Sequence, residues 1–448
     1  MYHHHFNYRY VLRVVKNNIG LVLNNILISV QLGLLLLLPL LLTVVTPNMA
    51  SVALRNVVQG NSEFTQKLHS VLAADAKPQE NIFFSPISAH AALSMAYQGA
   101  RGATSAEFAQ VLNIKDQATA ANGYNEVMRH LNSVENVTLH IANKIYVDEK
   151  SELNENFHAN IKRKFLSEVE PVSFRASLTA AQLINSWVEG KTNNKIHELV
   201  QPNDLNEDTR MVLVNAIYFK GNWKEKFNEN DTRVDKFHLN AHESVDVQMM
   251  HKSAKFLYKF DANLEAQVLE LPYANEDISM IVVLPDKVDG IADLESKLAD
   301  YDLTRITQDM YQTEVSVTLP KFKIETTMQL NEPLQKLGLK QAFTNQADFS
   351  DMIKNEALKI SKVVQKAFIE VNEEGSEAAA ATAMVIRARI ARISRPATFK
   401  ANHPFILLIQ KTLTDGQRRH RKNRGRTFTL FFARISDIKP STNYNNNQ

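Results

Sequence analysis

Apolar and polar residues alternate along this chain with two periods, one typical of helices and one typical of strands. Apolar residues recur at helical spacing over Leu54–Leu72, which predicts a long helix. A second helix is predicted over Ala89–Gln98, with Ser88 as its N-cap and Gly99 after its end. A short strand followed by a turn is expected between the two helices, at Asn81–Pro86.

The clearest strand signal is the run Met211–Phe219, which is almost continuously apolar and therefore predicts a strand buried on both faces. Further strands, two of them joined by the polar turn Ala274–Asp277, are predicted at Val268–Tyr273, Ile278–Leu284, Val315–Phe322, Val363–Val371, Pro404–Ile409 and Thr427–Ile435. Helices and strands follow one another in irregular order. This order predicts an α+β fold in one mixed domain over residues 51–440, followed by a polar, disordered tail over residues 441–448.

Residues 1–50 are interpreted as a leader that precedes the domain. Basic residues such as Arg9 and Arg13 come before the leucine-rich run Leu32–Val45, as in a secretory signal. Three interpretations stay open: a cleaved signal peptide, a signal anchor that spans the bilayer with Ile26–Val45, or a leader that is absent because translation starts at Met49. The first two predict that the domain is secreted or extracellular.

The composition narrows the classes of function. The chain has 448 residues, a formal net charge of +3 and no cysteine. The lack of cysteine excludes disulfide scaffolds, thiolate metal sites and cysteine nucleophiles, and the small net charge does not by itself indicate a nucleic-acid or membrane partner. The sequence contains no GxSxG, P-loop, GxGxxG or HExxH motif. We therefore expect a protein that is not an enzyme and that holds no cofactor and no metal.

The segment Val371–Ala383 is compatible with two different structures. Its run of alanines, with Ser376 as an N-cap, favours a helix. Glu373, Glu374 and Glu377 are interpreted as a solvated face rather than as acid/base carboxylates. However, the alanines have no large apolar neighbours with which to form a core face. The alternative is a strand that slips between two paired strands, because small side chains avoid the roughly 1–3 kcal/mol that overpacking a core costs.

A resemblance supports the second structure. The stretch Glu373–Thr382 resembles the reactive-loop hinge of inhibitory serpins. Other stretches resemble further motifs of the serpin family in the expected order: Asn81–Ser88, Asn215–Trp223, Leu271–Tyr273, Leu319–Phe322, Leu337–Leu339 and Phe399–Phe405. The resemblance covers roughly residues 52–440 and is similar in style to insect haemolymph serpins. It implies the serpin fold, with helices around three β-sheets and an exposed reactive loop at about residues 373–398.

The resemblance also implies a function, which is irreversible suicide inhibition of a serine protease by a monomer. In this family the protease cleaves the loop and forms an acyl-enzyme, and the cut hinge then inserts into the central sheet. The hinge residues that the resemblance implies are Glu373, Glu374, Gly375, Ser376, Glu377, Ala378, Ala379, Ala380, Ala381 and Thr382. A non-inhibitory carrier or chaperone is the alternative, but it would typically have charged, bulky or proline residues at these positions.

The position of the cleaved bond is implied by counting. The family usually places it fourteen residues after the hinge glycine, and counting from Gly375 gives Arg389, with Ile390 on the other side of the bond. Arginine suits a protease with an anionic specificity pocket, so the implied target is trypsin-like. Counting back from the strand after the loop favours Arg392 instead, and Arg387 is a further alternative.

Other residues are assigned by the resemblance to the opening of the central sheet. Ser85, Ser88 and Asn215 match the family's shutter region, and Trp223 matches the tryptophan near the point where insertion begins. A histidine usually completes the shutter, and the matching position here holds Gln365. Because Gln365 falls on the apolar face of its predicted strand, we expect it to be buried and hydrogen-bonded.

Two surface features remain. The basic segment Arg418–Arg426 interrupts the last predicted hairpin. Weak polyanion binding through this segment is a further alternative function, although a solvated loop or a faulty exon boundary is favoured, and no specific nucleic acid is expected. Asn136 and Asn230 begin glycosylation sequons, which matter only if the chain is exported.

Overall fold

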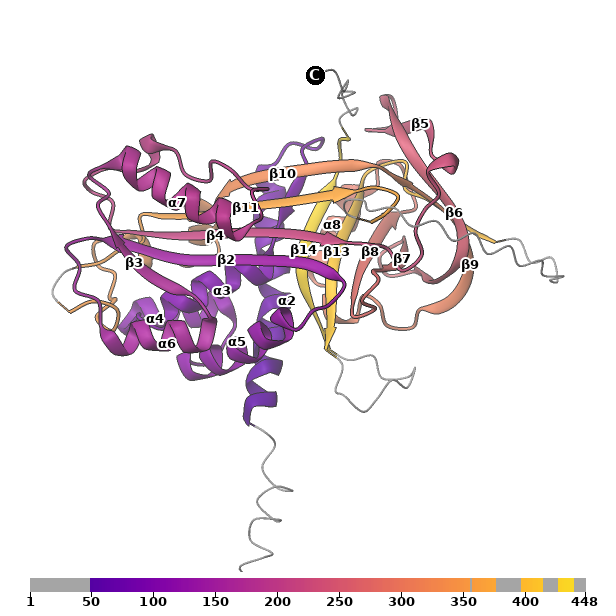
Figure 1. The fold of residues 1–448 in the computed structure, drawn as a ribbon. Coiled ribbons are helices and arrows are strands. Elements are labelled where there is room, and N and C mark those ends of the chain that lie inside the picture. The colour runs from indigo at the N-terminus through magenta and orange to yellow at the C-terminus, as the bar shows by residue number, and fades with distance from the viewer. Residues whose placement is uncertain (1–48, 355–356, 376–395, 414–425, 439–448) are drawn as a thin grey trace, which may run out of the picture. The chain divides into compact units, whose positions relative to one another are not determined.

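The computed structural model describes residues 49–354, 357–375, 396–413 and 426–438, and Ala53–Gln448 group into one compact unit (Figure 1). The helices are α2 (Met49–Asp75), α3 (Pro86–Tyr97), α4 (Gly102–Leu112), α5 (Gln117–Asn132), α6 (Glu155–Phe165), α7 (Ser177–Lys191), α8 (Ile291–Ala299) and α9 (Asn331–Lys336). Single 3-10 turns lie at Pro202–Asp204, Glu229–Asp231, Leu303–Arg305 and Gln341–Phe343. The strands are β1 (Ile82–Phe84), β2 (Val137–Asp148), β3 (Glu168–Val172), β4 (Met211–Gly221), β5 (Arg233–His238), β6 (Ser244–Asp261), β7 (Ala266–Pro272), β8 (Ile278–Pro285), β9 (Tyr311–Pro320), β10 (Phe322–Gln329), β11 (Lys362–Val371), β12 (Ala397–Lys400), β13 (Phe405–Leu413) and β14 (Arg426–Ile435).

One sheet has five strands in the order β10-β11-β4-β2-β3. Its strands β11 and β4 are parallel neighbours, whereas β10 pairs with β11 and β2 pairs with β4 in the antiparallel sense. Figure 1 shows α7 on one side of this sheet and α3, α4, α5 and α6 on the other. Val212 and Val214 of β4 pack with α7, while Leu213 and Ile217 face the main core. The prediction that Met211–Phe219 is a strand buried on both faces is therefore confirmed.

The other sheet has nine strands, in the order β1-β14-β13-β8-β7-β6-β9-β12 with β5 beside β6. Three sheets were expected, but two of them form one continuous sheet among the described residues. The long β6 joins them, because it pairs with β5 near its start, with β9 along its middle and with β7 at its end. The strand predicted at Val315–Phe322 is divided: β9 ends at Pro320, and Phe322 begins β10 of the five-stranded sheet. The other predicted strands and the mixed α+β class are confirmed.

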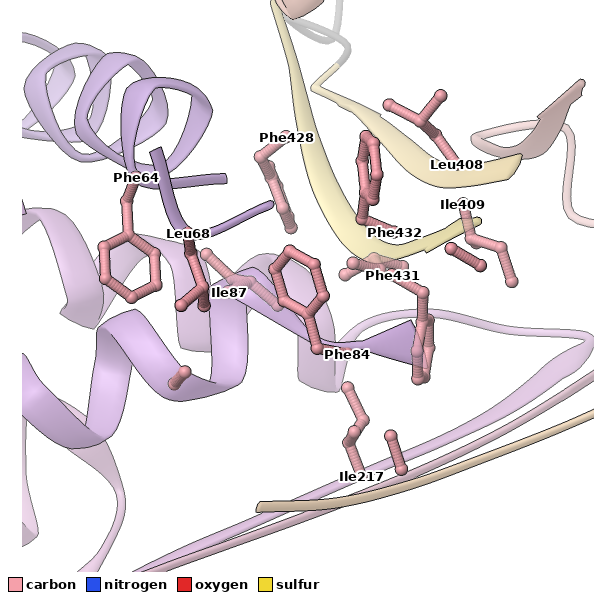
Figure 2. Packing of buried hydrophobic residues seen from close by; sticks show 14 of the residues in the cluster. Phe64, Leu68, Phe84, Ile87, Ile217, Leu408, Ile409, Phe428, Phe431 and Phe432 are labelled. Atoms are coloured by element: carbon pink, nitrogen blue, oxygen red, sulfur yellow. The ribbon is translucent and has the colours of Figure 1, made fainter. Parts of the chain in front are cut away.

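The main hydrophobic core fills the space between the two sheets (Figure 2). Phe64 and Leu68 enter it from α2, which confirms the first predicted helix. Phe84 of β1, Phe431 of β14 and Ile217 of β4 meet them there, and all five side chains are 0% exposed. Residues far apart in the sequence thus share one core, so that neither sheet is buried without the other.

The start of α3 differs from the prediction. Ser85 and not Ser88 is the N-cap: the Ser85 Oγ accepts a hydrogen bond from the Ser88 backbone N–H at 3.4 Å. Pro86 occupies the first helical position. A backbone N–H there would have no partner within the helix, so proline loses no hydrogen bond. The helix therefore begins three residues earlier than predicted, and both serines are fully buried.

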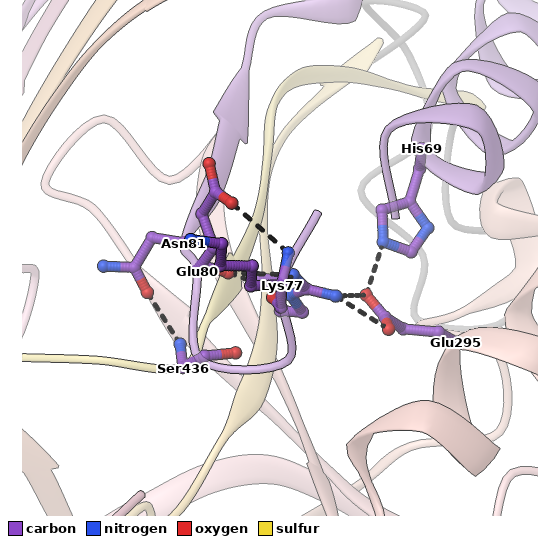
Figure 3. Close-up of polar contacts among 7 residues, drawn as sticks. His69, Lys77, Glu80, Asn81, Glu295 and Ser436 are labelled. Carbon is purple, nitrogen blue, oxygen red and sulfur yellow. Dashed lines mark hydrogen bonds and ion pairs between the residues drawn. The ribbon is translucent and has the colours of Figure 1, made fainter. Parts of the chain in front are cut away.

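A buried ionic cluster ties α2, α8 and β14 together (Figure 3). Glu295 of α8 lies 2.9 Å from the Nε2 of His69 and 3.2 Å from the Nη1 of Arg434. The Arg434 guanidinium also donates to the backbone oxygens of Lys77 and Glu80, at 2.9 Å each. A buried arginine with this set of acceptors avoids most of the free-energy cost of an unpaired charge, so it holds the end of β14 against its neighbours.

A second buried polar contact joins α3 to α4 and α5 through His90. The Nδ1 of His90 is 2.6 Å from the Tyr124 hydroxyl, and its Nε2 is 2.9 Å from the Leu112 carbonyl oxygen. Because a carbonyl only accepts, Nε2 carries the proton and Nδ1 accepts from Tyr124. Burial lowers the pKa of His90 to about 4, although the hydrogen bond to Leu112 favours its charged form.

This environment makes part of the stability depend on pH. Between the unfolded pKa of 6.5 and the folded pKa of about 4, the unfolded chain binds a proton at His90 that the folded chain does not. We expect His90 to remove about 2–3 kcal/mol from the free energy of unfolding as the pH falls from about 7 to about 4.5. In a His90→Gln variant this loss is absent, so the stability gap between wild type and variant narrows in acid.

Urea unfolding of both proteins at the two pH values measures the gap. His158→Gln, on the exposed side of α6, is the matched control and should leave the gap constant. A His90→Gln gap that is the same at both pH values would contradict the prediction.

Candidate functional site

Polar side chains form a row across three neighbouring strands of the five-stranded sheet. Asn215 of β4 lies opposite Gln365 of β11 on one side and opposite Asn143 of β2 on the other. Opposite residues on neighbouring strands share a face, so the three amide side chains meet. Their exposed fractions are 1% for Gln365, 0% for Asn215 and 7% for Asn143.

The amides of this row donate hydrogen bonds in one direction. The Gln365 Nε2 donates to the Asn215 Oδ1, and the Asn215 Nδ2 donates to the Asn143 Oδ1. The Asn143 Nδ2 is the last donor of the row and has no partner among the described residues. The bond between Gln365 and Asn215 crosses the boundary between β11 and β4, which we call the seam.

Two serines bring the start of α3 against this row. The Gln365 Oε1 accepts from the Ser85 N–H at 2.8 Å, and its Nε2 donates to the Ser85 carbonyl at 2.9 Å. The Ser88 hydroxyl donates to the Asn143 Oδ1 at 3.0 Å and accepts from the Asn215 amide. The expectation that Gln365 is buried and hydrogen-bonded is confirmed. We call Ser85, Ser88, Asn143, Asn215 and Gln365 the shutter cluster.

The second part of the site is the turn by which the chain leaves β11. The backbones of Asn372 and Gly375 exchange two hydrogen bonds, of 2.9 and 3.2 Å. Gly375 also forms an antiparallel bridge with Asn222, which directly follows β4. The turn therefore places Gly375 between the ends of β11 and β4, at the mouth of the seam.

Only glycine fits at position 375. Its φ is +126°, a conformation that residues with a side chain rarely adopt. A Cβ atom there would lie 2.1 Å from the Gly221 carbonyl oxygen, which is backbone and has no room to move away. Conformation and space thus give two separate reasons for the glycine of the hinge.

The two glutamates of the turn are held by lysines. The Glu373 side chain is 6% exposed, lies 2.8 Å from the Lys321 Nζ and accepts from the Thr232 hydroxyl at 2.6 Å. Burial by itself would raise the pKa of Glu373, but the hydrogen bonds from Lys321 and Thr232 outweigh it and lower the pKa. Glu374 pairs with Lys226. The interpretation of these glutamates as a solvated face is therefore wrong for Glu373, because the tertiary fold brings Lys321 to it.

Trp223 belongs to the turn rather than to the shutter cluster. Its backbone N–H donates to the Glu374 carbonyl at 2.8 Å, and its indole Nε1 donates to the Asn372 carbonyl at 2.9 Å. The indole ring stacks on Tyr273 with the ring centroids 4.6 Å apart. Trp223 is only 3% exposed and so is also part of the hydrophobic core. The same side chain therefore packs in the core and holds the turn in place.

Several predicted residues lie outside the described residues. These are the rest of the hinge, Ser376–Thr382, the candidate bonds at Arg387, Arg389–Ile390 and Arg392, and all of the basic segment before Arg426. Their assignments stay predictions, as does the helical alternative for the alanine run. Asn136 and Asn230 are both exposed, and their glycosylation stays a prediction too.

Sequence reasoning missed four members of the site. Asn143 completes the shutter cluster, Thr232 and Lys321 hold Glu373, and Lys226 pairs with Glu374. Each comes from a strand or turn far away in the sequence, and no local pattern distinguishes it from other polar residues nearby. The signal for Asn143 is its register opposite Asn215, which requires knowledge of strand pairing.

The contacts of the site are hydrogen bonds and ion pairs that join strands and the turn after β11. Within them, no group of three His, Asp or Glu side chains is placed to hold a metal ion, and no helix is long and apolar enough to cross a membrane. What the site provides is a seam between two paired strands, crossed by the side-chain hydrogen bond from Gln365 to Asn215, with a fixed turn at its mouth.

The shutter cluster predicts a large effect for a change at its centre. Gln365→Leu would leave the Ser85 N–H and the Asn215 Oδ1 buried without partners, while the Ser85 carbonyl would keep its hydrogen bond from the Ala89 N–H. We expect the free energy of unfolding to fall by about 3 kcal/mol, since each unpaired buried group costs about 1–3 kcal/mol and the costs do not simply add. Urea unfolding measures the change. Gln329→Leu, at an exposed position of β10, is the control and should stay within about 0.5 kcal/mol of wild type; equal effects would contradict the role of the cluster.

Comparison with known proteins agrees with this geometry. The family model described as "Serpin (serine protease inhibitor)" matches residues 59–416. Antichymotrypsin-2 of Bombyx mori is 39% identical over 359 residues, covering 80% of this chain and 96% of its own length. Antitrypsin of Bombyx mori is 38% identical over 374 residues, covering 83% and 95%. Serpin48 of the insect Tenebrio molitor superimposes with a TM-score of 0.76 at 36% identity, over 86% of this chain and 98% of that one.

The residues that the family model matches include the five-stranded sheet, the shutter cluster and the turn after β11, and the relatives carry the names antichymotrypsin and antitrypsin. The chain belongs to the serpin family.

Proposed function

We propose that the chain is an irreversible suicide inhibitor of trypsin-like serine proteases, which traps its target by inserting the cleaved loop into the seam. The observation that carries this proposal is the isolated antiparallel bridge between Gly375 and Asn222, because it places Gly375 beside the end of β4, at the mouth of the seam. A chain that turns back from the end of β11 runs antiparallel to β11. Since β4 is parallel to β11, the same chain also runs antiparallel to β4.

The register of the inserted strand follows from this bridge. Continuing it residue by residue pairs Ala378 with Phe219 and Thr382 with Asn215, counted along β4. The pairing of Asn372 with Gly375, continued along β11, brings Thr382 opposite Gln365 as well. The two counts agree because Gln365 and Asn215 are themselves cross-strand partners. Insertion therefore requires that the hydrogen bond between Gln365 and Asn215 break, and a threonine hydroxyl arrives at that point.

The small side chains of the hinge suit this register. Ala378 would face Phe219 and Ile369, which are 0% and 1% exposed in a core that is already filled. Ala379 would lie opposite Tyr218 and Phe368, on the face that packs with α7. An alanine enters either face without the overpacking that a larger residue would cause.

The trap begins with ordinary protease chemistry. The protease serine attacks the carbonyl of the bait residue, its oxygen forms an ester, and the peptide bond to the next residue breaks, so that the new amine leaves with a proton. We assign the bait to Arg389 because it lies fourteen residues after Gly375, and its arginine side chain fits an anionic specificity pocket. The family relatives carry both antitrypsin and antichymotrypsin names, so the trypsin-like target rests on this residue and not on them.

Incubation with trypsin tests the proposal directly. We expect a complex that survives SDS, because the ester persists when insertion outpaces hydrolysis, and a released C-terminal peptide that begins at Ile390. N-terminal sequencing of that peptide identifies the bond. Arg389→Ala should abolish the complex with trypsin, whereas Arg392→Ala, the matched control, should keep it. Cleavage without any complex would contradict inhibition and favour the carrier alternative, and a peptide beginning after Arg392 would correct the bond alone.

A charge in the inserting segment should separate cleavage from trapping. We expect Ala378→Glu to turn the inhibitor largely into a substrate, with the moles of inhibitor used per mole of trypsin rising by roughly tenfold or more. The reason is that burying a carboxylate between Phe219 and Ile369 costs several kcal/mol and slows insertion. Titration of residual trypsin activity measures the ratio. Ala391→Glu makes the same change beyond the assigned bond and should leave the ratio near that of wild type. Equal ratios for the two variants would contradict insertion along this register.

A further inference from the structure

The row of amides in the shutter cluster continues to a methionine on the edge of the five-stranded sheet. Met328 of β10 lies opposite Gln365 of β11, which in turn lies opposite Asn215 of β4. Opposite residues on neighbouring strands share a face, and Met328 accordingly packs against the main hydrophobic core, on the face that carries the shutter cluster. Since β10 is the first strand of this sheet, the Met328 thioether is the outermost member of the row that crosses the seam.

Met328 is more exposed than most methionines of the chain. Among the methionines whose side chains the structure describes, seven are at most 8% exposed, whereas Met328 and Met310 are only partly buried. A thioether that solvent reaches is open to small oxidants, and burial protects it. A peroxide should therefore oxidise these two side chains first. Of the two, only Met328 lies beside the seam, because Met310 precedes β9 of the nine-stranded sheet.

Oxidation changes the chemical group that faces Gln365. The sulfur of Met328 gives an electron pair to one oxygen of a peroxide, the O–O bond breaks, and the other oxygen takes up a proton and leaves as water when the oxidant is hydrogen peroxide. The sulfur loses two electrons and the peroxide gains them. A weak acceptor that packs against the core thus becomes a polar sulfoxide with an oxygen that accepts hydrogen bonds.

Gln365 has no free donor for this new acceptor. The two N–H groups of its Nε2 donate to the Ser85 carbonyl and to the Asn215 Oδ1. The Asn143 Nδ2, which has no partner among the described residues, lies at the opposite end of the row. When the sulfoxide oxygen takes one N–H of Gln365, β11 loses a hydrogen bond either across the seam or to α3. Either loss weakens the closure of the seam.

We propose that Met328 is a modification site, at which oxidation by a peroxide to the sulfoxide loosens the seam between β4 and β11. The modification does not depend on whether the protein inhibits a protease. Its consequence for insertion rests on the proposed function, because a looser seam lets the cleaved hinge enter faster.

Peptide mapping by mass spectrometry tests the site. The full chain is treated with hydrogen peroxide at neutral pH, and the gain of one oxygen atom is followed at each methionine. We expect Met328 to be oxidised at least about tenfold faster than Met211 of β4 and Met280 of β8, which are both 0% exposed. Equal rates at the three positions would overturn the site.

Hydrogen exchange tests the effect on the seam. All proteins carry Met384→Leu, because Met384 lies in the predicted reactive loop. After oxidation we expect the backbone amides of β4 and β11 to exchange roughly tenfold faster, which is the change that the loss of one hydrogen bond gives. Amides that exchange at the same rate before and after oxidation of Met328 would overturn the proposal.

Two matched substitutions assign the effect to one sulfur. Met328→Leu keeps a side chain of similar volume and should make the exchange of β4 and β11 insensitive to peroxide, with Met328→Ile as a second variant if the first does not fold. Met310→Leu makes the same change away from the seam and should leave the sensitivity as in wild type. A sensitivity that survives in a folded Met328 variant would overturn the assignment.

The consequence for inhibition is measured separately. At saturating trypsin we expect the SDS-stable complex of the oxidised protein to form several-fold faster than that of the untreated protein, and Met328→Leu should remove the difference. Equal rates together with faster amide exchange would overturn the link between the seam and insertion. If no complex forms before oxidation either, the proposed function fails, while peptide mapping and hydrogen exchange still decide the modification site.

Discussion

The parallel pairing of β4 with β11 is the constraint on which the rest of this structure depends. Parallel neighbours need a long connection, and here the chain between them builds most of the nine-stranded sheet. Because β11 ends at the turn Asn372–Gly375, a strand that follows it back along the seam is antiparallel to both neighbours. Antiparallel pairing is somewhat more stable per residue than parallel pairing. Under the proposed function, insertion of the loop would replace one parallel ladder with two antiparallel ladders, and this gain in pairing would favour the inserted state.

The shutter cluster opposes that exchange. Gln365 makes two hydrogen bonds to Ser85 and one to Asn215, so it ties β11 both to α3 and across the seam. Buried networks of this kind are stable only when their members are satisfied, and here the unmet donor lies at the far end, on Asn143. An amide also does not titrate, whereas the histidine that the family usually places here does. The closure of this seam by Gln365 thus does not respond to pH.

The turn at the mouth of the seam is fixed by contacts from several parts of the fold. Glu373 and Glu374 are paired with Lys321 and Lys226, and Trp223 donates twice to the turn backbone. Ordering a chain segment costs conformational entropy, on the order of 1–2 kcal/mol per residue. Because these contacts already order the turn, the first step of a strand entering the seam carries less of this cost.

The sequence by itself determined the elements whose signals are local: the apolar run of β4, the helical period of α2, the strand β11 and the small residues after Gly375. It also placed Gln365 on a buried face, since alternation along one strand suffices for that. The resemblance to the serpin family added the grouping of Ser85, Ser88, Asn215 and Gln365. Only the tertiary structure decided that Asn143 completes this group and that Ser85 rather than Ser88 caps α3. It also decided that Lys321 and Thr232 pair with the carboxylate of the buried Glu373. The reason is physical: strand register and ion pairing join residues far apart in the chain, and their geometry follows from the packing of whole elements rather than from any local pattern.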